Sequence, residues 1–438
     1  MSRTFLLGGL SIALFVLGLA ALRGELVALA IPFALYLLVG YWRAPQSVTL
    51  DVTRHLSAER ASPEQPVTVT LTIFNRGAAL DEVFVEEVLP DGLRILDGSN
   101  HHMARLDQDA SLTWTYSVTG RRGYYGFPAI RVEARDGLGL IQRNEQFTPP
   151  GQLLVLPPVL KLKHVYIRPR RTRVYAGTIP ARIGGPGVDF FGVREYQPGD
   201  SPRRINWHVS ARHGGDGEIG DEALQRLYSN EFEQERVADV GIILDGRDRT
   251  NRFGGGHSLF EHSVLAAAAL ADAFLAQGNR VGMLVYGQYL QWTLPGYGKR
   301  QREKILHALA AARSGGSDIF SNLGHLPTRL FPVNSQIVVV SPLVEDDLSV
   351  LVQLRARGYQ VMAVSPNPVA FETSFLPRRE EVTRAARVVA MERELFLRKL
   401  NRAGVQLLDW DVSVPFDKAV RTALGRPPRQ MQALGRSM

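Results

Sequence analysis

The distribution of hydrophobic residues changes several times along this 438-residue chain, and each change predicts a different kind of structure. Residues 4–22 carry no charge and are nearly all apolar, and a second apolar run extends from Leu26 to Trp42. Each run has roughly the 17–20 residues that a helix needs to cross a bilayer. Residues 1–43 are therefore predicted to form a two-helix transmembrane anchor, with a signal peptide or a buried soluble hairpin as alternatives.

Between residues 46 and 156, apolar and polar positions alternate with a period of two, which is typical of strands with one buried face. Segments 66–74 and 111–118 show this alternation most clearly. Turn residues such as Asn75 and Gly77 separate the segments at the spacing expected of short antiparallel strands. The pattern predicts an all-β, immunoglobulin-like sandwich.

Proline pairs at 149–150 and 157–158 bracket one short strand and mark where the region 157–236 begins. Six basic residues lie between Lys161 and Arg173. We predict a solvated linker here, followed by a Gly-rich and Arg-rich insert; contact with anionic lipid or nucleic acid is the alternative for the basic run.

From residue 237 to 416, apolar runs alternate with amphipathic helical patterns. This order predicts an α/β region with a doubly wound, mainly parallel sheet. Residues 417–438 are rich in Gly, Pro and Arg and are predicted to be a basic C-terminal tail. The predicted strands are 237–245, 280–286, 336–341, 360–364 and 405–409.

Composition narrows the classes of function. The absence of cysteine excludes disulfides, thiolate zinc sites, iron–sulfur clusters and cysteine nucleophiles. The net charge of +8 permits contact with nucleic acid or anionic lipid without requiring it, and we expect no nucleic-acid partner. Arg3 and Arg43 flank the apolar runs, so the positive-inside bias favours soluble domains in the cytoplasm and an anchor in the cytoplasmic (inner) membrane.

The segment from Gly184 to Gly214 has a composition unlike that of a loop or a core. Its arginines and carboxylates can form bidentate ion pairs, which predicts a polar brace or a partner-binding site. Asp200, His208 and Ser210 also supply the residue types of a hydrolase, although their closeness in sequence does not establish the geometry. The candidate residues are Arg194, Glu195, Tyr196, Gly199, Asp200, Arg203, Arg204, Trp207, Ser210 and Arg212.

These residues, together with Gly187, Phe190, Ile205 and Ala211, resemble the signature of the bacterial and archaeal family known as domain of unknown function 58. The segments 122–126 and 136–140 carry a weaker second likeness. The resemblance implies a membrane-tethered sandwich that leads into a von Willebrand factor type A-like domain. It also implies as partners a MoxR-type AAA+ ATPase and a transglutaminase-like membrane protein, which are often encoded beside members of the family.

The end of the first α/β strand is the expected ligand-binding edge of the sheet. A-type domains normally carry Asp-x-Ser-x-Ser there and bind magnesium, with a Thr and an Asp from later loops. In this chain arginines replace both serines, and Pro342 stands where the last Asp belongs. The residues of this degenerate metal-ion-dependent adhesion site are Asp245, Arg247, Asp248, Arg249 and Ser317.

Two cations beside a carboxylate oppose a divalent ion, so we expect no metal and no cofactor, with magnesium as the alternative. We expect Arg247 or Arg249 to pair with Asp245 in place of the ion. The resulting hypothesis is a non-enzymatic, membrane-anchored scaffold or adaptor that works with a MoxR-type ATPase in assembly or maturation of a membrane or envelope complex. The alternatives are a hydrolase that uses Asp200 and His208, and a metal-dependent adhesion module.

Overall fold

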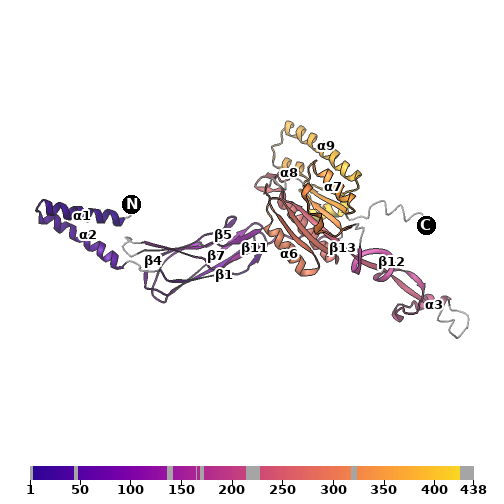
Figure 1. Ribbon diagram of the computed structural model, residues 1–438, viewed down its shortest axis with the longest axis horizontal. Coiled ribbons are helices and arrows are strands. Elements are labelled where there is room, and N and C mark those ends of the chain that lie inside the picture. Colours follow the sequence, from indigo (N-terminus) through magenta and orange to yellow (C-terminus); the bar gives the residue numbers. More distant parts are fainter. Residues whose placement is uncertain are drawn as a thin grey trace. The chain divides into compact units, whose positions relative to one another are not determined.

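The computed structural model divides into two units, Met1–Leu156 and Pro157–Met438, and each has its own core. Figure 1 shows the elements of both units in sequence colours. The residues that the structure describes are 3–43, 48–135, 142–163, 165–167, 172–213, 227–316 and 323–424.

The first unit begins with two apolar helices, α1 (Arg3–Ala20) and α2 (Gly24–Arg43), which pack against each other. A Cβ atom at Gly18 would lie 2.7 Å from the side chain of Val27, so the glycine permits the helices to approach closely beside the turn. In α2, residues 24–42 are long and apolar enough to cross a membrane, and only 11% of this apolar stretch is buried. The apolar stretch of α1 is shorter. The predicted apolar helix pair is confirmed.

The rest of the first unit consists of β-strands. Two four-stranded sheets, ordered β1-β3-β7-β5 and β10-β9-β4-β6, each contribute to one apolar core, and a small sheet has the order β2-β11-β8. Alternate residues of β3 are at most 1% exposed, as the period of two predicted. The strands are β1 (Leu50–Leu56), β2 (Arg60–Ala61), β3 (Val67–Asn75), β4 (Leu80–Glu87), β5 (Leu93–Asp97), β6 (His101–Leu106), β7 (Ser111–Gly120), β8 (Gly123–Gly126), β9 (Ile130–Arg135), β10 (Gln142–Phe147) and β11 (Gln152–Val155).

The second unit is built on a sheet with the order β17-β16-β13-β18-β19-β20, in which β17 alone among these six is antiparallel to its neighbour. The predicted α/β region is confirmed. Its strands are β12 (Thr172–Glu195), β13 (Tyr228–Asp245), β14 (Phe253–Gly254), β15 (His257–Ser258), β16 (Arg280–Tyr286), β17 (Leu290–Gly296), β18 (Gln336–Val340), β19 (Gln360–Pro366) and β20 (Gln406–Trp410).

Helices pack on both faces of this sheet. Ile243 of β13 belongs to a core cluster with residues of α7 and α9, whereas α5 contacts the same strand outside that cluster. Strand alternation explains this arrangement, because neighbouring residues point to opposite faces. The helices are α3 (Trp207–His213), α5 (Leu259–Ala276), α6 (Gly298–Ala311), α7 (Asp347–Ala356), α8 (Pro368–Phe375), α9 (Glu380–Arg402) and α10 (Phe416–Leu424), with short 3-10 turns at Pro202–Arg204, Asp248–Thr250, Leu323–His325 and Thr328–Leu330.

The region predicted to be a linker contains a long strand. β12 pairs antiparallel with the first half of β13, from Glu195 opposite Tyr228 to Thr172 opposite Ala238, with several register shifts. The second half of β13 continues into the central sheet. This single strand therefore connects the signature segment to the α/β core. At the other end of the unit, α10 occupies the first residues of the predicted tail.

Three sequence features fall partly or wholly outside the described residues. The second likeness at 136–140 lies outside them, as do residues 168–171 of the basic run and residues 425–438 of the predicted tail.

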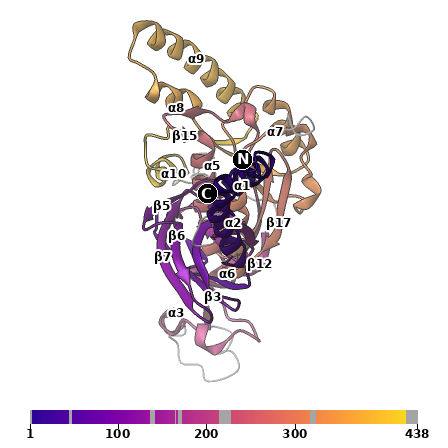
Figure 2. The same cartoon turned by 90° about the vertical axis from the view of Figure 1, so that its left-hand side faces the viewer.

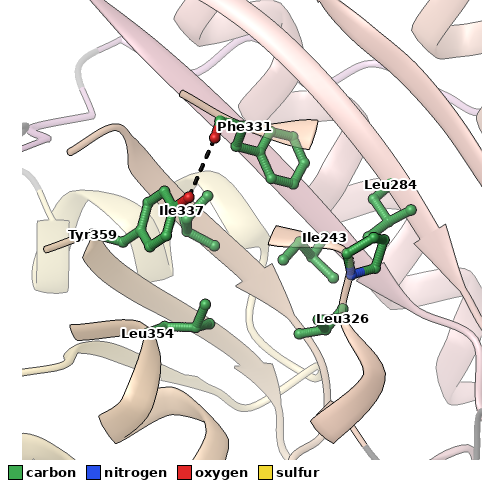
Figure 3. Close-up of a pocket in the computed structure, with 8 residues that line it drawn as sticks. Ile243, Leu284, Leu326, Phe331, Ile337, Leu354 and Tyr359 are labelled. Atoms are coloured by element: carbon green, nitrogen blue, oxygen red, sulfur yellow. Dashed lines mark hydrogen bonds between the residues drawn. The ribbon is translucent and has the colours of Figure 1, made fainter. Parts of the chain in front are cut away.

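One apolar hollow in the α/β core is packing and not a ligand site. Ile243, Leu284 and Leu354 are among the residues around it, and it has no room for a water molecule. At one side the Tyr359 hydroxyl donates a hydrogen bond of 3.2 Å to the Phe331 carbonyl oxygen, as Figure 3 shows. This bond satisfies the polar end of a buried ring.

Candidate functional site

The candidate site lies where the strand order of the sheet reverses. β13 is followed in sequence by β16 on one side, whereas β18 lies on the other side of β13. Open α/β sheets bind ligands at such a switch point, beyond the carboxyl ends of the strands. Asp245 ends β13, Ser341 follows β18, and Asp347 begins α7. These residues and Arg247 are completely or almost completely buried.

Arg247 joins the two carboxylates of this buried cluster. Its Nε and Nη2 donate to Asp245 at 2.9 and 2.8 Å, and its Nη1 and Nη2 donate to Asp347 at 3.0 and 2.9 Å. The Ser341 hydroxyl donates a further bond of 2.6 Å to Asp245 Oδ2. Both carboxylates are thus held bidentately by one guanidinium, the geometry that favours arginine over lysine.

Backbone groups hold the same cluster in place. The amide of Arg247 donates to Asp245 Oδ1 at 3.0 Å, and the amide of Val344 donates to Asp347 Oδ2 at 3.0 Å. The Ser341 hydroxyl oxygen accepts from the amide of Leu343, whose φ of 59° lies in the left-handed region. Leu343 lacks the freedom of glycine there, so the tight turn after β18 is maintained by its surroundings.

The electrostatics follow from burial and pairing. Burial raises the pKa of the Asp347 carboxyl, and the hydrogen bonds and charge of Arg247 act in the opposite direction. Burial lowers the pKa of Arg247, but hydrogen bonds to Asp245 and Asp347 raise it by more, so the net shift is upward. Burial also raises the pKa of nearby Tyr286 to about 12. The guanidinium therefore stays charged and offsets the two carboxylates.

The residues at this edge do not fit a magnesium ion. A hard cation needs free oxygen ligands in an octahedron, whereas the Asp245 oxygens already accept bonds from Arg247 and Ser341. Among the described residues, no group of three His, Asp or Glu side chains could hold a metal. Arg249 pairs instead with exposed Asp346 at 3.1 Å, and Asp248 is exposed. Ser317 lies outside the described residues.

The signature segment lies at the opposite end of β13 and forms a local brace. Arg194 at the end of β12 donates to Asp200 at 2.7 Å, and the amide of Gln197 donates to the other Asp200 oxygen at 3.1 Å. The Tyr196 hydroxyl donates to the Asp200 backbone oxygen at 3.1 Å. Gly199 adopts a φ of +111°, which explains the glycine in this turn. The Arg194 hydrogen bond is the largest cause of the lowered pKa of Asp200.

The remaining signature residues divide between structural contacts and exposed surface. Buried Ser210 accepts a hydrogen bond of 2.9 Å from the amide of Tyr228, and the Arg204 carbonyl accepts one of 3.5 Å from Ser229, so these two join the segment to β13. Trp207 is 65% exposed. Besides Gly199, the other exposed members are Phe190, Glu195, Arg203, Ala211 and Arg212.

The geometry does not assemble a hydrolase from this segment. Asp200 is engaged by Arg194, and Ser210 accepts a backbone hydrogen bond. Within the described parts of the chain, no hydrogen bond links exposed His208 to either residue. A triad requires its base to contact both the nucleophile and the orienting acid, so the residue types alone do not make a catalytic site.

Sequence reasoning missed two polar contributions. Asp347 completes the candidate site, yet its position at the start of a helix is one where an acidic residue is expected for helix stability alone. Arg393 of α9 bonds the Pro342 carbonyl, the Ser365 hydroxyl and Asp409 at 2.8–2.9 Å and so connects the ends of three strands. The sequence feature that could have identified Asp347 is the pair Asp346-Asp347, which follows a predicted strand.

The first unit contains a comparable buried network that sequence reasoning also missed. The side chains of Arg54 and Glu87 are fully buried and form an ion pair, and the Tyr116 hydroxyl donates to Glu87. Burial raises the pKa of Glu87, opposed first by the Tyr116 bond and then by Arg54. The guanidinium also stacks over Phe127, with its carbon 4.9 Å from the ring centroid. We assign this network to the stability of the β unit.

Residues 192–367 form a domain of the family described as protein of unknown function DUF58. This domain includes the switch-point cluster and most of the signature. Among curated relatives, the uncharacterized protein YeaD of Bacillus subtilis is 24% identical over 325 residues, which cover 73% of this chain and 76% of YeaD. The uncharacterized protein Rv1480 of Mycobacterium tuberculosis is 28% identical over 153 residues, which cover 34% of this chain and 44% of that relative.

Solved structures give only distant likenesses. A FixG-related protein from Vibrio parahaemolyticus is 9% identical, with a TM-score of 0.17 and coverage of 24% of this chain and 95% of that one. The PapD-like domain 7 of human CEP192 is 13% identical, with a TM-score of 0.17 and coverage of 25% and 89%. These values are too low to bear on function.

Proposed function

We propose that this protein is a non-enzymatic, membrane-anchored adaptor whose α/β unit is a von Willebrand factor type A-like domain that works without a metal. One observation carries the proposal: at the switch point, Arg247 is bonded to Asp245 and Asp347 where an A-type domain would hold its ion. The Arg247 guanidinium is a permanent part of the chain, whereas a metal ion can dissociate. This difference favours a structural role for this edge of the sheet.

Two further features support the proposal. The sheet has its first strand at the centre and an antiparallel edge strand, β17, in agreement with an A-type arrangement. The apolar side chains of α1 and α2 are largely exposed in the chain itself, for example Phe5 at 80% and Leu35 at 59%, which suits a lipid environment. We place the anchor in the cytoplasmic membrane and the folded units in the cytoplasm, as the flanking charges favour.

The partner we propose is a MoxR-type AAA+ ATPase, with a transglutaminase-like membrane protein as a further component of the assembly. The family resemblance supplies both. The exposed signature residues supply a surface for one of them, because tryptophan and arginine are the residue types that most often dominate protein interfaces. Trp207, Arg203 and Arg212 are each exposed, and the segment that carries them joins the end of β13 that lies away from the central sheet.

Co-purification tests this proposal. The tagged full chain, solubilised in detergent, should retain the MoxR-type ATPase of its own organism, and Trp207→Ala should reduce recovery by about tenfold, the loss typical of an interface hot spot. Trp292→Ala is the matched control, because Trp292 is 55% exposed on edge strand β17. Repeated failure of the wild-type chain to retain the ATPase would contradict the partnership, and equal losses in both variants would exclude the signature as the contact.

A further inference from the structure

A groove of about 370 Å³ lies between α8 and the first half of α9. In Figure 2, α9 extends beyond the sheet and α8 lies beside it. Only the second half of α9 reaches the core, through Phe396, Leu397 and Leu400. The first half has α8 as its neighbour, so the groove is open to a ligand and is separate from the switch-point cluster.

The floor of the groove is apolar. Val382, Ala386 and Ala390 lie on the same face of α9 and line it, because residues three and four apart in a helix are neighbours. Leu376 lines it from the chain between the helices and is 48% exposed. Beyond the groove, Val389 is also 48% exposed. The apolar stripe of an amphipathic helix is normally covered, and here it is covered only in part.

Two arginines line the same groove and lack a carboxylate partner. Among the described residues, neither Arg378 nor Arg387 forms an ion pair. Other arginines of α9 are matched: Arg384 pairs with Glu380, Arg398 with Glu394, and Arg393 with Asp409. On this helix and the turn before it, the arginines that form no ion pair among the described residues are Arg378 and Arg387, which line the groove, Arg379 next to Arg378, and Arg402 in the last turn. A positive charge in the last turn is favourable to the helix itself, so Arg402 needs no carboxylate partner.

We propose that this groove binds an acidic segment of a partner protein, with apolar side chains on the floor and carboxylates paired to Arg378 and Arg387. The combination of apolar floor and bidentate donors matches a peptide that carries both kinds of side chain. The exposed apolar residues at the rim extend the contact beyond the groove, which favours a polypeptide over a small anion. The inference adds to the proposed adaptor function by naming the chemistry of a bound segment.

Titration of labelled peptides of defined sequence tests the proposal. Fluorescein-labelled short peptides that combine Leu or Phe with Asp or Glu are titrated with the detergent-solubilised full chain, beside counterparts in which Lys replaces each acid. We expect saturable binding of acidic peptides and none of the basic ones. The double variant Arg378→Glu and Arg387→Glu should weaken binding by at least about tenfold. The control pair Arg384→Glu and Arg398→Glu changes the net charge equally and should leave binding unchanged.

A second variant tests the groove without changing charge. Ala386→Trp fills the groove and should abolish binding, whereas Ala385→Trp, on the adjacent exposed position that does not line it, should not. Thermal unfolding of both variants verifies that each is folded. Loss of binding with Ala385→Trp as well, or equal effects of the two arginine pairs, would overturn the proposal.

Two other occupants of the groove, a lipid and a second copy of the chain, would give different results. Binding of vesicles rich in phosphatidylglycerol that depends on Arg378, without selection of acidic peptides, would assign the groove to lipid and overturn the proposal. Self-association that Ala386→Trp abolishes would assign it to a second copy. Because no ATPase is present, these results are independent of the co-purification, and either proposal can fail while the other stands.

Discussion

The guanidinium of Arg247 is the side chain on which the candidate site depends. It is 2% exposed and offsets the charges of two carboxylates that are fully buried. Burial of charged groups is costly, and a buried pair becomes strongly destabilising when one partner is removed. Exposed ion pairs contribute little in comparison. The exposed pair of Arg249 and Asp346, which joins the same two segments of the chain, provides that contrast.

Replacement of Arg247 by Met should therefore destabilise the α/β unit by about 3–5 kcal/mol, because Asp245 and Asp347 would remain buried without a counter-charge. Replacement of exposed Arg249 by Met should cost less than about 1 kcal/mol. Urea unfolding of the full chain in detergent measures both values. Similar values for the two variants would show that the buried carboxylates do not depend on Arg247.

At the scale of elements, strand and helix periodicity predicted most of the α/β unit and the better-patterned strands of the β unit. The segments 280–286 and 336–341 were predicted within one residue, because parallel strands buried on both faces read as continuous apolar runs. β12 was not predicted, since its glycines and prolines are typical of loops and its pairing with β13 is a long-range contact. Edge strand β17 was also not predicted, because its sequence has only a weak apolar pattern.

In the candidate site too, some residues could be predicted from the sequence and others could not. Asp245 and the replacement of serines by arginines could be read from the sequence because they follow a predicted strand directly. Which arginine pairs with Asp245, and the contribution of Asp347 one hundred residues after Arg247, depend on tertiary contacts. Similarly, the brace of Arg194 and Asp200 was one of several ion pairs that the sequence allowed.

The contact between α5 and α8 makes the stability of the α/β unit depend on pH. His262 of α5 lies against Phe371 of α8 and Trp410 of β20, with ring centroids 5.9 and 5.7 Å apart. Burial lowers its pKa from 6.5, and the charge of His257 adds to this effect. Below pH 6.5 the unfolded chain binds more protons than the folded one, so stability falls as pH decreases toward the folded pKa.

We expect the melting temperature of the α/β unit to decrease when the pH is lowered through 6.5, and His262→Phe to reduce that decrease while keeping the aromatic contacts. Thermal unfolding on either side of this pH measures the effect. His307→Gln, at an exposed position of α6, serves as the control. An unchanged pH dependence in His262→Phe would contradict the assignment.

At the scale of the whole molecule, each part has a separate role in the proposed function. In that proposal the apolar helices anchor the chain in a membrane. The β unit has its own core and buried network, and the α/β unit carries the switch-point cluster, the signature surface and the groove. β13 connects two of these surfaces, because its ends carry the signature segment and Asp245. An adaptor of this kind needs fixed surfaces more than it needs an exchangeable ion.

The central claim is that the edge of the sheet at Asp245 works without a metal ion. Calorimetric titration of the full chain in detergent with magnesium or manganese tests this claim most directly. We predict no saturable heat of binding, because Arg247 and Ser341 already donate to the oxygens of Asp245 that a metal would need. Saturable micromolar binding that Asp245→Ala abolishes would contradict it and would restore a metal-dependent adhesion site.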